Sequence, residues 1–200
     1  MSFQLPRLPW PGRAFALLLS AWLAVPVAAH AALPVGSAAP DVQLDAALDG
    51  KPFRFRLAEA LRQGPVVLYF YPKAFTAGCT VEAHLFAEAT PQFRAQGATV
   101  VGVSSDDLDT LRRFSTEHCR SQFAVAADPR AEVIRRYDAG FTLVPSVADR
   151  ISYVISPQGK VLKVHAGMDP EGHVRETLKA VGAWRAAQPP SGPAAGLSRP

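Results

Sequence analysis

The sequence predicts an α/β fold of three layers, with a mixed central sheet between helices. Short runs rich in β-branched and aromatic residues alternate with helical stretches from Leu33 to Trp184. Two of the runs, PVVLYFY and ATVVGVSS, are apolar at most positions, which is typical of strands covered on both faces. A chain of 200 residues with 48% hydrophobic and 19% charged content fits one soluble globular domain, placed here at 32–185.

The first half of this pattern contains six expected elements. Residues 53–57 alternate apolar and basic side chains, as in an edge strand, and 57–64 reads as a short helix that ends at a glycine. Residues 65–71 and 98–105 are the two buried strands. The long helix at 76–96 contains Pro91, which can kink it, and stops at Gly97. The next helix starts at Asp106 or Asp107 as N-cap and runs to about His118.

The second half ends in a hairpin and a helix. A short strand at 123–127 precedes the turn Asp128-Pro129 and a helix at 132–137. Strands at 151–156 and 160–167 form a hairpin across Pro157-Gln158-Gly159. Asp169-Pro170-Glu171 opens the last helix, which ends near Trp184. Parallel crossovers followed by an antiparallel hairpin fit a fold of thioredoxin type. The composition of 186–200 is that of a disordered tail.

Residues 1–31 have the pattern of a secretory signal peptide. Arg7 and Arg13 precede an apolar run at 14–29, and Ala29-His30-Ala31 is a small-x-small cleavage site. The run is shorter than the roughly 20 residues of a membrane span, so an uncleaved anchor is the less favoured alternative. The expected location is the bacterial periplasm, with no membrane attachment after cleavage.

The charge pattern argues against nucleic acid as a partner. The net charge is +4, and the basic doublets Arg112-Arg113 and Arg135-Arg136 have no interleaved aromatic residues. The sequence also has no phosphate-binding glycine loop, dinucleotide fingerprint or His/carboxylate metal cluster, so neither a cofactor nor a metal is expected.

The start of the long helix places a thiol in an unusual position. With Thr76 as N-cap, Cys79 is the third helical residue, where unpaired backbone N–H groups and the helix dipole favour an anion. We expect the Thr76 side chain to accept the Cys79 amide and the thiolate form to be favoured there. A small buried hydrophobe at a helix start explains the position equally well, and both interpretations stay open.

A resemblance to a known family bears on this choice. Pro72-x-x-x-Thr76-x-x-Cys79, directly after a strand, resembles the active-site motif of the peroxiredoxins. Further stretches resemble the bacterioferritin comigratory protein (Q-type) branch of the alkyl hydroperoxide reductase/thiol-specific antioxidant family: VVLYFYPK, CTVEA, the Asp128-Pro129 turn and Gly172-His173. The resemblance covers essentially all of Leu33 to Trp184.

The family implies roles for five of these residues. Cys79 would be the nucleophile that reduces hydrogen peroxide and organic hydroperoxides and becomes a sulfenic acid. Thr76 would orient the peroxide, and Pro72 would shield the site from water. Arg150 would reach the sulfur and stabilise negative charge, with Glu82 as the partner of its guanidinium. Without the resemblance, Arg150 would be read as a surface residue at a strand start and Glu82 as an exposed helical acid.

The second cysteine is the candidate for resolving the sulfenic acid. Many Q-type relatives carry a second cysteine five residues after the first, but His84 fills that slot here and is assigned no function. In other relatives the resolving thiol lies on the helix after the next strand, which implies Cys119; a buried bystander is the alternative. An external thioredoxin-like or glutathione-type thiol would then reduce the disulfide.

Other classes of protein fit the sequence less well. A thiol–disulfide oxidoreductase normally needs Cys-x-x-Cys, and a thioredoxin-like copper chaperone needs Cys-x-x-x-Cys; neither spacing is present. A non-catalytic domain with a structural disulfide is the remaining alternative. Monomer and homodimer are equally admissible.

Overall fold

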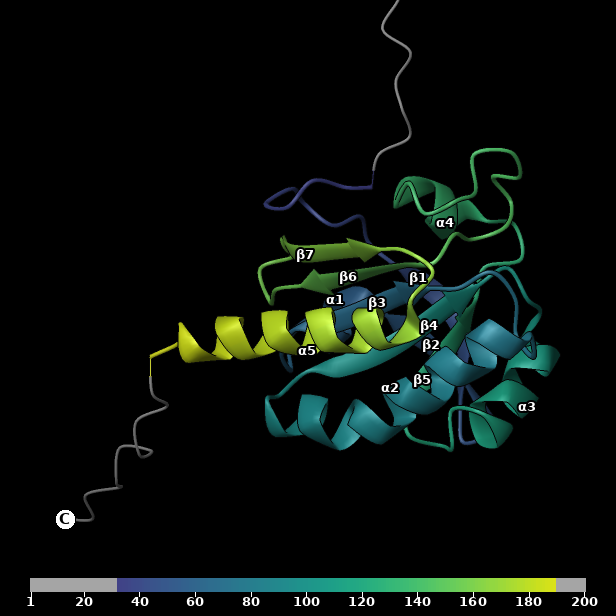
Figure 1. Ribbon diagram of the computed structural model, residues 1–200, viewed down its shortest axis with the longest axis horizontal. Helices are drawn as coiled ribbons and strands as arrows, with labels where there is room; N and C mark the ends of the chain where they lie inside the picture. The colour runs from purple at the N-terminus through teal and green to yellow at the C-terminus, as the bar shows by residue number, and fades with distance from the viewer. Residues whose placement is uncertain (1–31, 190–200) are drawn as a thin grey trace, which may run out of the picture.

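The protein forms a seven-stranded mixed sheet within residues 32–189, the part of the chain that the computed structural model describes. The strand order is β2-β1-β5-β4-β3-β6-β7 (Figure 1). The strands are β1 (Gln43–Leu48), β2 (Lys51–Arg56), β3 (Val66–Phe70), β4 (Thr99–Ser104), β5 (Ala124–Ala127), β6 (Ile151–Ile155) and β7 (Val161–Ala166). The helices are α1 (Leu57–Leu61), α2 (Ala77–Ala95), α3 (Leu108–Glu117), α4 (Glu132–Arg136) and α5 (Pro170–Ala186).

The pairing of the strands confirms the mixed sheet. β4 pairs in parallel with both β3 and β5, whereas β6 runs antiparallel to β3 and continues into the expected hairpin with β7. The predicted edge strand is β2, which does lie at one edge, although it starts two residues earlier than expected.

One strand was missed by the sequence analysis. β1 forms a hairpin with β2 and also pairs antiparallel with β5. Its sequence, QLDAAL, contains no β-branched or aromatic residue, so its local preference does not indicate a strand. Asp49 and Gly50 close the hairpin with positive φ angles of 53° and 68°.

The sheet is covered on both faces, as a three-layer fold requires. Side chains of β3 alternate: Leu68 and Phe70 face one apolar cluster, and Val67 and Tyr69 face the other. The first cluster also includes residues of α1 and α4, and the second includes residues of α2, α3 and α5. Figure 1 shows α5 running beside β6 and β7, and α2 beside α3.

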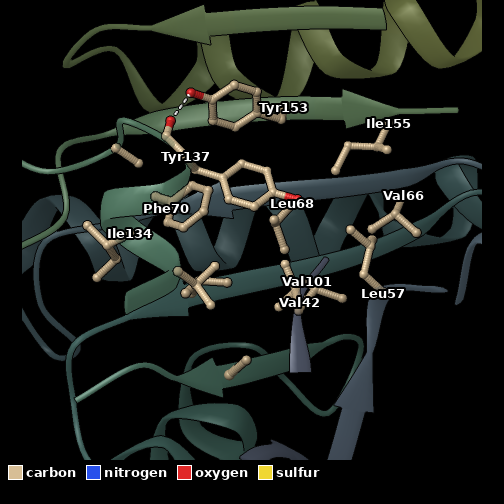
Figure 2. Close-up of a cluster of buried hydrophobic side chains, with 14 of the residues drawn as sticks. Val42, Leu57, Val66, Leu68, Phe70, Val101, Ile134, Tyr137, Tyr153 and Ile155 are labelled. Carbon is tan, nitrogen blue, oxygen red and sulfur yellow. Dashed lines mark hydrogen bonds between the residues drawn. The ribbon is translucent and has the colours of Figure 1, made fainter. Parts of the chain in front are cut away.

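The first cluster, shown in Figure 2, contains two tyrosines with paired polar groups. The Tyr153 hydroxyl donates a hydrogen bond to the Tyr137 carbonyl at 2.6 Å, so both rings are buried without leaving that hydroxyl unpaired. On the opposite face, Tyr69 packs directly over Gly102 of β4. A Cβ atom at position 102 would lie 2.8 Å from Tyr69 Cζ, so glycine is required there for the ring to lie flat.

The helix boundaries agree closely with the sequence. α2 begins after its N-cap Thr76 and ends at Ala95, followed by the C-cap Gln96 and by Gly97 with φ 76°. α5 extends to Ala186, slightly beyond the expected end near Trp184. The signal peptide predicted at 1–31 lies outside the described residues, as does residue 190 onward of the tail predicted at 186–200, whereas Ala186 is the last residue of α5. Within 32–189, no helix combines the length and apolar character needed to cross a membrane.

Candidate active site

The site is built at the end of β3, where the chain turns into α2. β3 pairs with β6 so that Phe70 lies opposite Ile151. The residue before Ile151 is Arg150, and this register therefore brings its side chain to the loop that precedes α2. Two positions far apart in the sequence meet because these strands are neighbours in the sheet.

An aspartate that follows β4 holds this loop in place. Asp106 Oδ2 accepts hydrogen bonds from the Ala74 backbone N–H at 2.7 Å and from the Ser104 hydroxyl at 2.9 Å. Its other oxygen pairs with Lys73 Nζ at 3.1 Å. From the sequence, Asp106 is expected only as one of two possible helix caps, and the cap of α3 is in fact Asp107. The only sequence signal for Asp106 was that two aspartates stand next to each other at a helix start, and this pattern does not indicate that one of them binds the loop before α2.

Contrary to the expectation, the Thr76 side chain does not cap the helix. Its hydroxyl donates a hydrogen bond to the Lys73 carbonyl at 2.9 Å, and no cap bond to the Cys79 amide forms. The preceding residue, Phe75, has a positive φ of 65°, which folds the loop back so that this carbonyl lies within reach. Thr76 is exposed, and Pro72 is half-buried at the start of the same loop.

Cys79 is the third residue of α2, and its side chain is buried. The thiol accepts a hydrogen bond from Arg150 Nη2 at a donor-to-sulfur distance of 3.5 Å. Gly78 leaves space for this contact, since a Cβ atom there would lie 3.1 Å from the same nitrogen. The other terminal nitrogen of Arg150 donates to Glu82 Oε2. The structure therefore brings Cys79, Glu82 and Arg150 together.

The carboxyl and guanidinium groups of this cluster are almost completely enclosed. Arg150 is 3% exposed and Glu82 0%. Burial raises the pKa of Glu82 to about 8, and the charge of Arg150 opposes this shift. Glu82 Oε1 and Arg150 Nε have no hydrogen-bond partner among the described protein groups. The arginine thus uses its two terminal nitrogens for two different anionic or polarisable partners.

His173 of α5 completes the surroundings of Glu82, and sequence reasoning did not assign it to the site. Its Nδ1 lies 3.8 Å from Glu82 Oε1 and 2.8 Å from the Ser152 hydroxyl, while Nε2 lies 2.8 Å from the Gly167 carbonyl. A carbonyl can only accept, so Nε2 carries the proton and Nδ1 accepts from Ser152. Burial lowers the pKa of His173 to about 4. The ring is therefore neutral near pH 7.

Cys119 lies just beyond the C-cap of α3, the position at the helix end that the sequence predicts. It is fully buried, and this burial raises the pKa of its thiol. Both cysteines belong to the apolar cluster on the α2 side of the sheet, and both are free thiols.

The donor set can support thiol chemistry. A buried thiol at a helix N-terminus with a guanidinium beside it suits a nucleophile that attacks as a thiolate and leaves negative charge on the departing group. Across residues 32–189, no group of three or more His, Cys, Asp or Glu side chains could hold a metal ion.

Comparisons with known proteins identify the family. The model of the AhpC/TSA family matches residues 35–164. Peroxiredoxin Q from wheat, Triticum aestivum, a chloroplastic protein, is 33% identical over 118 residues, covering 58% of this chain and 54% of that protein. Peroxiredoxin Q from Arabidopsis thaliana is 32% identical over 145 residues, covering 72% of this chain and 65% of that protein.

A solved structure extends the comparison to the whole fold. The peroxidoxin BcpB from Mycobacterium tuberculosis is 30% identical, with a TM-score of 0.67, covering 76% of this chain and 97% of that one. The sequence match to the wheat protein spans only about half of that protein's length. The chain belongs to the AhpC/TSA family and has the thioredoxin-like fold of the peroxiredoxins.

Proposed function

We propose that this protein is a thiol-dependent peroxidase that reduces hydrogen peroxide and organic hydroperoxides at Cys79. The observation that carries the proposal is the contact of Arg150 Nη2 with Cys79 Sγ at 3.5 Å, inside a buried cluster at the first turn of α2. A cation fixed by Glu82 next to a nucleophilic sulfur stabilises negative charge without reorganising during the reaction.

The reaction begins with attack of the Cys79 thiolate on one oxygen of the peroxide. An S–O bond forms and the O–O bond breaks, so the sulfur is oxidised to a sulfenic acid and the peroxide is reduced to water or an alcohol. The departing oxygen carries negative charge until it takes up a proton. Arg150 is placed to stabilise both the thiolate and this oxygen.

The loop residues act on the substrate. The Thr76 hydroxyl donates to the Lys73 carbonyl, which leaves its oxygen free to accept a hydrogen bond from a protonated peroxide. Pro72 narrows the entrance beside this loop and limits access of water. Glu82 acts through Arg150, whose orientation it fixes, and does not contact the substrate.

Cys119 is the proposed resolving cysteine. Its thiol attacks the sulfenic sulfur of Cys79, an S–S bond forms, and the S–O bond breaks with loss of water. A thioredoxin-like dithiol or a glutathione-type thiol then reduces the disulfide and returns both cysteines to the thiol state. The position of Cys119 at a helix end supports this role because such an end can unwind at low cost.

Export to the periplasm is the proposed location. It rests on the basic start, apolar run and cleavage pattern of residues 1–31. A fusion of these residues to an alkaline phosphatase that lacks its own signal tests it, because the phosphatase is active only after export. A fusion in which Arg7 and Arg13 are replaced by Glu serves as the control.

The peroxidase proposal is tested with purified protein, candidate reductants and two variants. Peroxide consumption should be abolished in Cys79→Ser. Cys119→Ser should still consume one equivalent of peroxide and then stop with oxidised Cys79. Wild-type activity that survives in Cys79→Ser would rule out the proposed site. Continued turnover of Cys119→Ser with a dithiol would instead indicate a one-cysteine cycle.

A further inference from the structure

The segment around Cys119 has an uncommon backbone conformation. The Cys119 segment, residues 118–121, follows directly after α3. Arg120 and Ser121 are consecutive non-glycine residues with positive φ angles of 49° and 55°. L-amino acids rarely adopt the left-handed region, and two in succession need support from outside the segment.

Two side chains of α2 supply part of that support. His84 Nε2 lies 3.2 Å from His118 Nδ1, within hydrogen-bond distance. Glu88 Oε1 lies 3.1 Å from Arg120 Nη1 and forms a salt bridge. His84 and Glu88 are one helical turn apart and therefore lie on the same face of α2. Their partners stand immediately before and after Cys119, so the two contacts bracket the thiol.

The His118 ring also connects the Cys119 segment to the loop that precedes Cys79. The His118 ring packs edge-on against Phe75, with ring centroids 5.3 Å apart, and lies tilted against Phe114 at 5.4 Å. Cys119 is fully buried beneath them. A thiol in this position cannot meet an external reductant or an alkylating reagent. The two cysteines are free thiols held on different elements, Cys79 on α2 and Cys119 just after α3.

We propose that His84 and Glu88 are positioning residues that form a latch, and that release of the Cys119 segment from this latch sets the rate of disulfide formation. The inference rests on the proposed function, and specifically on Cys119 as the resolving cysteine. Disulfide formation, with loss of water, competes with attack of a second peroxide on the Cys79 sulfenic acid, which gives sulfinic acid. A latch that opens slowly therefore favours the sulfinic product, and one that opens fast favours the disulfide.

The latch is first tested without any peroxide chemistry. In the full chain carrying Cys79→Ser, alkylation of Cys119 by N-ethylmaleimide reports how often the segment opens. Both partners of the salt bridge are exposed, so Glu88→Gln should speed alkylation about twofold to fivefold. His84→Ala should speed it about fivefold, and the double variant about tenfold or more. Asp109→Asn, which removes the Asp109–Arg112 pair on α3 without touching the segment, should leave the rate unchanged.

The second test measures the oxidation steps by rapid quenching and mass spectrometry. The latch variants should form sulfenic acid at the wild-type rate, form the disulfide faster by the same factors, and accumulate less sulfinic acid in excess peroxide. Glu88→Arg should accelerate disulfide formation, and adding Arg120→Glu should restore the wild-type rate. A role limited to general stability would not predict this recovery.

Each result separates the two proposals. Unchanged alkylation of Cys119 in the double variant overturns the latch. Faster alkylation with an unchanged rate of disulfide formation overturns the link between latch and resolution. Failure of wild-type Cys79 to form sulfenic acid overturns the proposed function, whatever the alkylation rates are.

Discussion

Replacement of Arg150 by lysine separates the chemistry of the site from its stability. The two terminal nitrogens of Arg150 serve two partners: Nη1 donates to Glu82, and Nη2 donates to Cys79 Sγ at 3.5 Å. Lysine keeps the positive charge but has a single nitrogen on a flexible chain. A carboxyl oxygen is a stronger hydrogen-bond acceptor than a thiol sulfur, so the ammonium group of Arg150→Lys should bind Glu82 and leave the sulfur without a charged donor.

The expected loss follows from the strength of that one contact. A hydrogen bond to a charged group contributes about 1.5–3 kcal/mol. If this contribution is realised as negative charge develops, the rate of the reaction with peroxide should fall about 10- to 150-fold. Stability should fall less than in Arg150→Met, because methionine leaves the buried carboxyl of Glu82 without its donor, which costs about 1–3 kcal/mol. Lysine keeps Glu82 paired.

The assay is competition with horseradish peroxidase for hydrogen peroxide, in a Cys119→Ser background that isolates the first oxidation of Cys79. Arg54→Lys is the matched control, because Arg54 pairs with Asp45 at 3.1 Å on the exposed edge strand. Urea unfolding of each variant checks that the fold is retained. A folded Arg150→Lys protein that reacts within threefold of the wild type would refute the role assigned to Nη2.

Three further predictions concern the surroundings of the site and the packing of the sheet. Burial raises the pKa of Glu82 from its ordinary 4.5 to about 8, so between these pH values the folded state keeps a proton that the unfolded state has lost. The free energy of unfolding should therefore decrease as pH rises from about 4.5 to about 8. Glu82→Gln should flatten this pH dependence, measured by urea unfolding, and an unchanged pH dependence would contradict the raised pKa of Glu82. Asp106→Ala should destabilise by about 1–3 kcal/mol and slow the peroxide reaction, because the Ala74 amide loses its partner. The control Asp107→Ala, which removes only the cap of α3, should destabilise by about 0.5–2 kcal/mol and leave the rate of the peroxide reaction unchanged. Equal rates of Asp106→Ala and Asp107→Ala would exclude a role of Asp106 in the loop. Gly102→Ala should destabilise by about 1–3 kcal/mol in thermal unfolding, because its Cβ would lie 2.8 Å from the Tyr69 ring, and an unchanged melting temperature would contradict that packing.

The elements that the sequence predicts are those with strong local signals. β3 is apolar throughout and β4 at most positions, and α2 has a threonine just before its first turn and a glycine just after its C-cap. β1 lacks such a signal because alanine and aspartate do not favour strands, and it is held by pairing with β2 and β5. Pairing between segments far apart in the chain is not encoded in local composition.

The same distinction applies to the candidate site. The motif around Cys79 and the helix start after Thr76 could be found in the sequence, and the resemblance to the peroxiredoxins pointed to Arg150 and Glu82. Asp106 was named only as a possible helix cap and His173 only as part of the resemblance; neither was assigned to the site, because each is a single polar residue whose partner lies on another element.

The sequence by itself determined that a thiol lies at the third position of a helix after a buried strand, and that the domain is of the α/β class. Both depend on periodicity and capping, which act over a few residues. Only the tertiary structure decided that Arg150 reaches Cys79 across 71 positions of the chain and that His84 reaches His118 across 34. These contacts depend on strand order, on the register of β3 with β6 and on the packing of α2 beside α3, which arise when the whole core is buried at once.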